Sequence, residues 1–228
     1  KAVAQLKTMK KAVESDPSFA MPYAGLADSY LMLGFMQAFP ATEMLPKVKA
    51  AAQRAIELDP LLADPHATLG YAAGLFDWDW QTAQRELEAA MQLNPNYQWA
   101  PHWLGVLMCG RGHTRRALEL IEYSAELDPL SPIINVGAGI PLHIARRYEE
   151  AAARYRSVLD TETKFVPGLY YLGITLEMLG DYVPAIEHLL ARMAALEPDV
   201  IVAEAGASPL EPYNGTEAYR RLAPLVKV

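Results

Sequence analysis

The sequence lacks several features that point to specific functions. It holds one cysteine, Cys109, among 228 residues, so it can form no internal disulfide and its stability cannot depend on an oxidising compartment. No apolar run approaches the roughly 18 residues of a membrane-spanning helix. Lysine and arginine total 20 against 27 acidic residues, for a formal net charge of -7. Because nucleic-acid surfaces need clustered basic residues to displace counterions, we expect this segment to bind neither nucleic acid nor a membrane.

The residues that usually carry chemistry form no catalytic or metal-binding pattern. None of the five histidines pairs with another histidine, a cysteine or a carboxylate at a helical ligand spacing such as HExxH. Cys109 has no catalytic motif around it, and no strand precedes Gly137-Ala138-Gly139 to make it a phosphate loop. We therefore predict no enzymatic activity, no metal and no cofactor. The alternative is an enzyme whose site lies within or beyond this segment.

An Asp-Pro or Asn-Pro pair recurs along the chain at a nearly constant interval. Successive pairs are separated by 43, 35 and 34 residues, and the same phase continues to Thr163 and Pro198. Such a period is typical of stacked supersecondary units that contact only their neighbours. Within each period, apolar residues recur twice at helical spacing, which predicts two antiparallel helices, A and B. The pairs are Asp16-Pro17, Asp59-Pro60, Asn94-Pro95 and Asp128-Pro129.

Small residues recur in phase with this period. Since a close crossing of helices A and B leaves room for little more than hydrogen or methyl, these columns predict the contact within each pair. Three further glycines, Gly34, Gly112 and Gly180, are expected to end A helices in the left-handed conformation. The A-helix column contains Gly70, Gly105, Gly139 and Gly173, and the B-helix column contains Ala83, Ala117, Ala151 and Ala185.

Irregular positions give separate predictions. An insertion around 35–42 predicts a long exposed loop between the first A and B helices. Pro141 falls inside a predicted helix, so we expect a kink near 138–141. Trp78 and Trp80 are expected to begin a B helix and to pack between repeats, and Trp103 is expected in the core.

The columns resemble those of the tetratricopeptide repeat family, whose unit is a 34-residue helix-turn-helix. The best match is Tyr170-Tyr171-Leu172-Gly173, followed by Gly180-Asp181-Tyr182 and Ala185; Tyr23, Leu26 and Tyr30 match in the first repeat. The resemblance implies an all-α, right-handed superhelix, an α-solenoid of about five helix pairs. We expect an array over 1–198, with a cap or linker at 199–228 that holds a short helix near 216–226. The array would comprise a half-repeat helix at 1–15 and repeats at 18–60, 61–95, 96–129, 130–163 and 164–198.

The segment Asp77-Trp78-Asp79-Trp80 is similar to one in bacterial tetratricopeptide proteins whose arrays follow a DNA-binding, nucleotide cyclase or kinase domain. This implies a regulatory part of a larger bacterial signalling protein. Because the sequence begins at Lys1, we expect an upstream part. A cytoplasmic location is expected, or a periplasmic one if that part spans a membrane.

In such a superhelix the A helices line the concave face, so the repeat phase assigns side chains to a groove. No lysine or arginine falls at these positions, whereas family members that grip a partner's C-terminal carboxylate use lysine, arginine and asparagine there. We predict a non-catalytic scaffold that binds a protein, as a peptide or helix, in an apolar groove with acidic spots. The alternative is a self-association module, a homo-oligomer or a chain whose own segment fills the groove. The predicted groove residues are Asp28, Leu31, Tyr71, Trp99, His102, Val106, Ile140, His143, Tyr170, Ile174 and Glu177; the same phase adds Met21, Ala24, Met32, Asp64, Ala67, Leu75, Cys109, Ile133, Val136, Ile144 and Met178.

Overall fold

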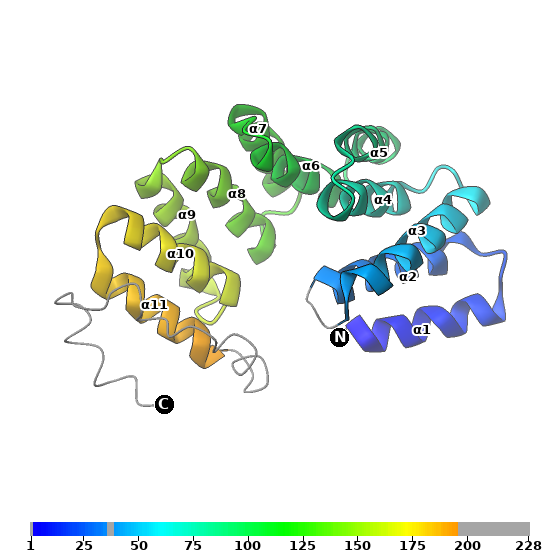
Figure 1. Cartoon of the computed structure of the whole chain (residues 1–228), viewed down its shortest axis with the longest axis horizontal. Helices are drawn as coiled ribbons and strands as arrows, with labels where there is room; N and C mark the ends of the chain where they lie inside the picture. The colour runs from blue at the N-terminus through cyan, green and yellow to red at the C-terminus, as the bar shows by residue number, and fades with distance from the viewer. Residues whose placement is uncertain (1, 36–38, 196–228) are drawn as a thin grey trace. The chain divides into compact units, whose positions relative to one another are not determined.

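The computed structural model describes residues 2–35 and 39–195, whose regular elements are all α-helices (Figure 1). The chain divides into two compact units, 1–127 and 128–228. No helix in the described part is long and apolar enough to cross a membrane. The first unit contains α1 (Ala2–Ser15), α2 (Ala20–Phe35), α3 (Ala41–Leu58), α4 (Ala63–Phe76), α5 (Trp80–Leu93), α6 (Trp99–Gly110) and α7 (Thr114–Leu127). The second contains α8 (Pro132–Ile144), α9 (Tyr148–Thr161), α10 (Val166–Leu179) and α11 (Tyr182–Ala195).

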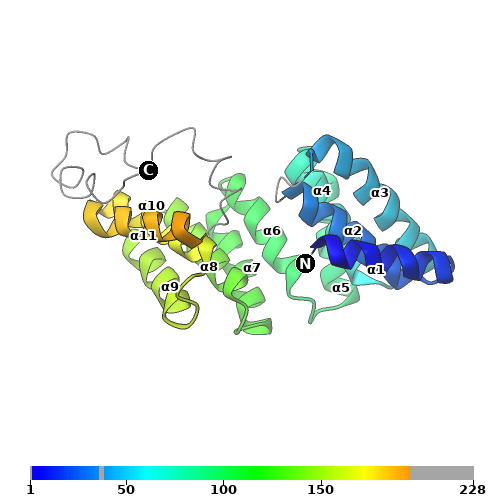
Figure 2. The same cartoon turned by 90° about the horizontal axis from the view of Figure 1, so that it is seen from below.

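Consecutive helices pack side by side within each unit. In the first unit α2 packs on α3, α4 on α5 and α6 on α7, while α1 lies along α2 (Figures 1 and 2). The A helices α2, α4 and α6 also contact one another in succession and form one layer. In the second unit α8 packs on α9 and α10 on α11, and the A helices α8 and α10 meet. The predicted all-α solenoid of helix pairs is confirmed.

In three of the four Asp-Pro and Asn-Pro pairs, the side chain of the first residue accepts the backbone N–H two residues later, in the turn after the helix. Asp59 and Asn94 are the C-caps of α3 and α5, with extended backbones at φ -146° and -138°. Proline disfavours helical backbone in the residue before it, which explains this extension. The Oδ1 atom of Asp59 accepts the Leu61 N–H at 3.0 Å, and that of Asn94 accepts the Asn96 N–H at 3.1 Å. A short side chain with an acceptor oxygen therefore closes the turn that the proline starts.

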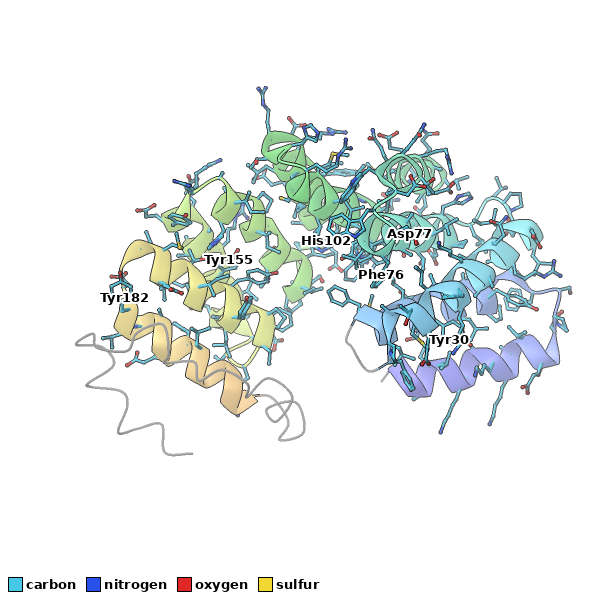
Figure 3. All side chains as sticks on the ribbon, viewed as in Figure 1. Tyr30, Phe76, Asp77, His102, Tyr155 and Tyr182 are labelled. Carbon is cyan, nitrogen blue, oxygen red and sulfur yellow. The ribbon has the colours of Figure 1, made fainter. Side chains whose placement is uncertain are left out.

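The glycine column brings the A and B helices into close contact. A Cβ atom added to Gly70 would lie 2.9 Å from the carbonyl oxygen of Ala83, and one added to Gly173 would lie 2.8 Å from Cγ of Leu189. These distances leave no room for a methyl group, so the predicted small-residue contact is confirmed. In the same way Gly105 faces Ile121, and Gly139 faces the ring of the fully buried Tyr155 (Figure 3).

The turns after α4, α6, α8 and α10 each contain a left-handed residue. Gly112 and Gly180 have φ values of 78° and 82°, as their predicted role requires. Trp78 and Arg146 stand in the same phase and also have positive φ values, 58° and 60°. The prediction for Gly34 is wrong: this residue lies inside α2, where an added Cβ would meet Cβ of Met44 at 3.3 Å.

Other irregular positions agree with expectation only in part. The insertion lengthens α3, which begins at Ala41 and carries Pro46 inside it, so the inserted residues do not all form a loop. Helix α8 continues through Pro141 to Ile144, and the kink expected near 138–141 stays a prediction. Trp80 begins α5 as predicted, but Trp78 is 70% exposed and does not pack between repeats. The predicted cap or linker at 199–228 lies outside the described residues.

Candidate functional site

The A-helix layer of the first unit holds a cavity of about 360 Å³. Its lining includes Asp28 and Trp99 from the predicted groove and Ala24, Met32 and Asp64, which the repeat phase also assigns to it. None of the lining residues is lysine or arginine. The remaining lining residues are Gln5, Gly25, Thr68, Tyr97, Gln98 and Trp103. Helices α1, α2, α4 and α6 and the α5–α6 connection thus contribute to one site.

Two carboxylates dominate the charge of this cavity. Asp28 on α2 and Asp64 on α4 are both half-buried, and neither forms an ion pair or a hydrogen bond with a residue that the structure describes. Burial raises the pKa of Asp28, and the charge of Asp64 raises it further. Burial also raises the pKa of Asp64, although a place in the first turn of a helix favours the ionised form. Ionisation of each of the two carboxyl groups therefore destabilises the folded protein.

Two hydroxyl groups lie beside these carboxylates. Thr68 follows Asp64 by one helical turn and is only 1% exposed, yet its hydroxyl makes no hydrogen bond within the described ranges. Burial raises the pKa of the Tyr97 phenol, and the charges of Asp64 and Asp28 raise it further. Tyr97 therefore stays protonated at neutral pH. The cavity combines two carboxylates with two hydroxyl groups that can donate or accept hydrogen bonds.

An aromatic run forms one wall. The rings of Tyr71 and Trp103 are stacked at 4.9 Å, those of Trp103 and Trp99 lie 5.8 Å apart, and His102 meets Trp99 edge-on at 5.6 Å. Trp103 is 6% exposed, so the predicted core position is confirmed while its ring also lines the cavity. Trp99 thus contacts both Trp103 and His102.

Three predicted groove residues are buried. Leu31 is fully buried in the core, and Tyr71 and His102 (Figure 3) are 6% and 7% exposed, so a ligand cannot reach them without a rearrangement. Burial lowers the pKa of His102 to about 4, which keeps the imidazole neutral, and its Nδ1 atom has no hydrogen-bond partner among the described residues. Val106, one turn after His102, is half-buried.

The second unit presents a different surface on its A helices. Large apolar side chains remain exposed there: Ile133 and Ile144 on α8, and Tyr170 and Met178 on α10, by 38%, 47%, 39% and 54%. All four stand in the predicted groove phase. The predicted residues Ile140, Ile174 and Glu177 are half-buried on the same helices. This surface is apolar with one acidic side chain.

His143 joins the two A helices of the second unit. Its Nδ1 atom lies 2.8 Å from the hydroxyl oxygen of Thr175, which itself donates to the carbonyl oxygen of Tyr171 at 2.7 Å. Because the hydroxyl proton is already used, Nδ1 of His143 must donate, and the neutral ring carries its proton there. Burial lowers the pKa of His143, in keeping with this neutral form. His143 positions α8 against α10.

The repeat columns did not predict some of the residues that line the cavity. Tyr97 and Gln98 precede α6, so a reading confined to A-helix columns cannot find them. Gln5 belongs to α1, which the repeat phase left without groove positions. Thr68 lies in α4 one turn after Asp64 and could have been found by that spacing. In the described part of the chain, no group of three or more histidine, cysteine, aspartate or glutamate residues is placed to hold a metal ion.

Solved structures of tetratricopeptide repeat proteins share this fold. YrrB, described as a TPR protein with an unusual peptide-binding site, is 19% identical with a TM-score of 0.52, over 86% of this chain and 96% of its own. PilF of Pseudomonas aeruginosa is 16% identical with a TM-score of 0.61, over 87% and 97%. Human IFIT1, solved with m7Gppp-AAAA, is 16% identical with a TM-score of 0.73, over 87% and 46%.

The sequence also matches a curated protein. The peroxisomal targeting signal receptor of Candida albicans is 25% identical over 201 residues, which are 85% of this chain. The chain spans about a third of that receptor, 32% of its length. No family model matches the sequence. At these identities the structural likeness establishes a tetratricopeptide-like fold.

Proposed function

We propose that this chain is a non-catalytic protein-interaction scaffold whose A-helix surfaces bind a peptide or helix of another protein. The observation that carries the proposal is the solvent-accessible surface of the A helices, a cavity of about 360 Å³ in the first unit and four exposed apolar side chains in the second. Exposed apolar groups gathered on one surface are typical of interaction sites. YrrB, whose structure has this fold, is described as having a peptide-binding site.

A protein ligand suits these surfaces better than a nucleic acid does. IFIT1 shares the fold and was solved with m7Gppp-AAAA, so fold alone does not decide between the two. Phosphate recognition needs positive charge. The cavity of the first unit instead has two carboxylates and no lysine or arginine in its lining.

The biological setting follows from the resemblance at 77–80. We propose that the scaffold is a regulatory part of a larger bacterial signalling protein and acts in the cytoplasm. The turn that contains Trp78 is ordered by a Lys49–Asp77 ion pair at 2.7 Å and by Asp79, which accepts the Thr82 N–H at 3.1 Å as N-cap of α5. The sequence of the full-length gene product would test this proposal, because a neighbouring signalling domain is expected.

The peptide-binding proposal can be tested with one variant in each unit. We expect Trp99→Glu to weaken binding at the first unit and Tyr170→Glu to weaken it at the second, measured on an array of random 12-residue peptides. Leu61→Glu and Leu130→Glu are matched controls, because these side chains are 74% and 90% exposed and lie outside the A helices. Circular dichroism would confirm that each variant is folded.

The outcomes separate binding from self-association. Equal peptide binding by the wild type and both A-helix variants would refute the proposed surfaces. A wild-type dimer that the A-helix variants dissolve, together with no peptide binding, would favour a self-association module instead. Sedimentation velocity on the same samples measures the oligomeric state.

A further inference from the structure

No described residue compensates the charges in the cavity of the first unit. Asp28 and Asp64 reach it from two different helices, and neither takes part in an ion pair with a residue that the structure describes. A half-buried carboxylate without a partner destabilises the folded protein. The stability of the folded protein therefore does not explain why two such carboxylates lie in one cavity.

The residues around the two carboxylates favour a lysine or arginine side chain as the bound cation. Trp99 and Trp103 supply aromatic surface, which attracts lysine and arginine head groups. The hydroxyl of Thr68 and the phenol of Tyr97 add polar groups beside the charges. The volume, about 360 Å³, falls within the range of ligand-binding cavities.

Other occupants fit this site less well. An apolar side chain would bury the carboxylates further and add to the desolvation cost. A phosphate or a C-terminal carboxylate would be repelled. A bare metal ion needs more oxygen ligands than two carboxylates provide and gains nothing from indole rings.

We propose that the cavity between α1, α2, α4 and α6 binds a basic side chain, lysine or arginine, of the partner peptide. The Asp28 and Asp64 carboxylates accept its N–H groups, and the Trp99 and Trp103 rings pack on its head group or aliphatic stem. This inference rests on the proposed peptide-binding function and names the partner chemistry of that same surface. The net charge of -7 also attracts a basic partner over a longer distance.

The test uses peptides whose ends are blocked by acetyl and amide groups, so that only side chains supply charge. Peptides would first be selected from a random 12-residue library on the full chain. Each lysine or arginine of the best binder would then be replaced in turn by norleucine, and the dissociation constant measured by fluorescence anisotropy. Replacing one particular basic residue is expected to weaken binding about tenfold or more, the size of a hydrogen-bonded charge contact.

The same norleucine peptide would then be measured on Asp28→Asn and Asp64→Asn. Loss of the carboxylate charge is expected to weaken binding of the basic peptide and to make the norleucine substitution nearly neutral. Asp160→Asn is the control, because it removes the same charge from an exposed position on α9. It is expected to bind both peptides like the wild type.

Failure of the basic-side-chain inference and failure of the peptide-binding proposal give different results. Selected peptides without a required basic residue, or a norleucine effect that persists in both asparagine variants, would overturn the basic-side-chain inference while peptide binding stands. No peptide binding at all would overturn both.

Stability provides an independent readout. Because the free carboxylates are unpartnered, Asp28→Asn and Asp64→Asn are expected to raise the melting temperature of the free protein while they weaken binding. A lowered melting temperature in both would mean that the carboxylates already have stabilising partners, which would refute the proposal.

Discussion

Trp78 occupies the backbone position that Gly112 occupies 34 residues later, with φ values of 58° and 78°. The pattern continues with Arg146 at 60° and Gly180 at 82°, so four successive turns use one left-handed conformation. A residue with a Cβ atom adopts it at a cost of about 1–2 kcal/mol. The fold therefore keeps this turn geometry even where the sequence lacks glycine.

Replacing Trp78 or Arg146 by glycine is expected to stabilise the protein. Each change should raise the free energy of unfolding by about 0.5–1 kcal/mol, because relief of the left-handed strain outweighs the extra freedom of glycine in the unfolded chain. Trp78 is 70% exposed, so little buried surface is lost, although its edge-on contact with Trp80 disappears. Urea denaturation measures the effect. Alanine at either position keeps the strain and is the control; equal stability of the alanine and glycine variants would contradict the explanation.

Glycine substitutions on α6 test the contact between helices A and B. Gly105→Ala is expected to cost about 1–3 kcal/mol, because its Cβ would collide with Ile121 and lie 3.1 Å from the carbonyl oxygen of Ala117. Gly110→Ala, on the same helix, would meet nothing within 4 Å and should not destabilise. Thermal unfolding of both variants checks the difference. The packing register would be wrong if the two melting temperatures were equal.

His102 is expected to make stability depend on pH. Burial lowers its pKa in the folded protein to about 4 from the usual 6.5. The unfolded chain therefore takes up a proton first as the pH falls, and stability is lost between about pH 6.5 and pH 4, by up to about 3 kcal/mol. Other titrating groups also contribute, so the measurement is the difference between the wild type and His102→Leu in urea denaturation across this range. A constant difference would contradict a buried neutral imidazole.

Cys109 is expected to react slowly in the folded protein. The thiol is buried, and burial raises its pKa to about 11, so little thiolate forms at pH 8. A colorimetric disulfide reagent should modify it far more slowly in buffer than in guanidinium chloride. Equal rates would show that α6 opens readily.

The packing contacts between helices A and B could be predicted from the sequence, because they recur in every repeat. The column from Gly70 to Gly173 and its alanine counterpart were predictable, since one steric requirement recurs at each crossing. The all-α solenoid of helix pairs followed from the same repetition. The lengthened α3 was not predictable, because an insertion can extend either a helix or a loop when its residues suit both.

The candidate site was only partly predictable, because the sequence assigns only those residues that follow the repeat phase. Asp28, Asp64 and Trp99 were assigned to the groove by phase and line the cavity. Leu31 shares that phase but turns into the core, because exposure varies across one helix face with the size of its neighbours. Tyr97 precedes an A helix, so its place in the cavity depends on the path of the α5–α6 connection. The repeat columns do not predict that path.

Helices that pack extensively are neighbours in the chain or next neighbours, as α2 with α3 and α2 with α4. Forming such contacts closes short loops only, at a small cost in chain entropy. Topologies dominated by local contacts fold quickly, and folding of a repeat array can start in any pair. A helix pair of this chain can therefore begin to form while later pairs are still being synthesised on the ribosome.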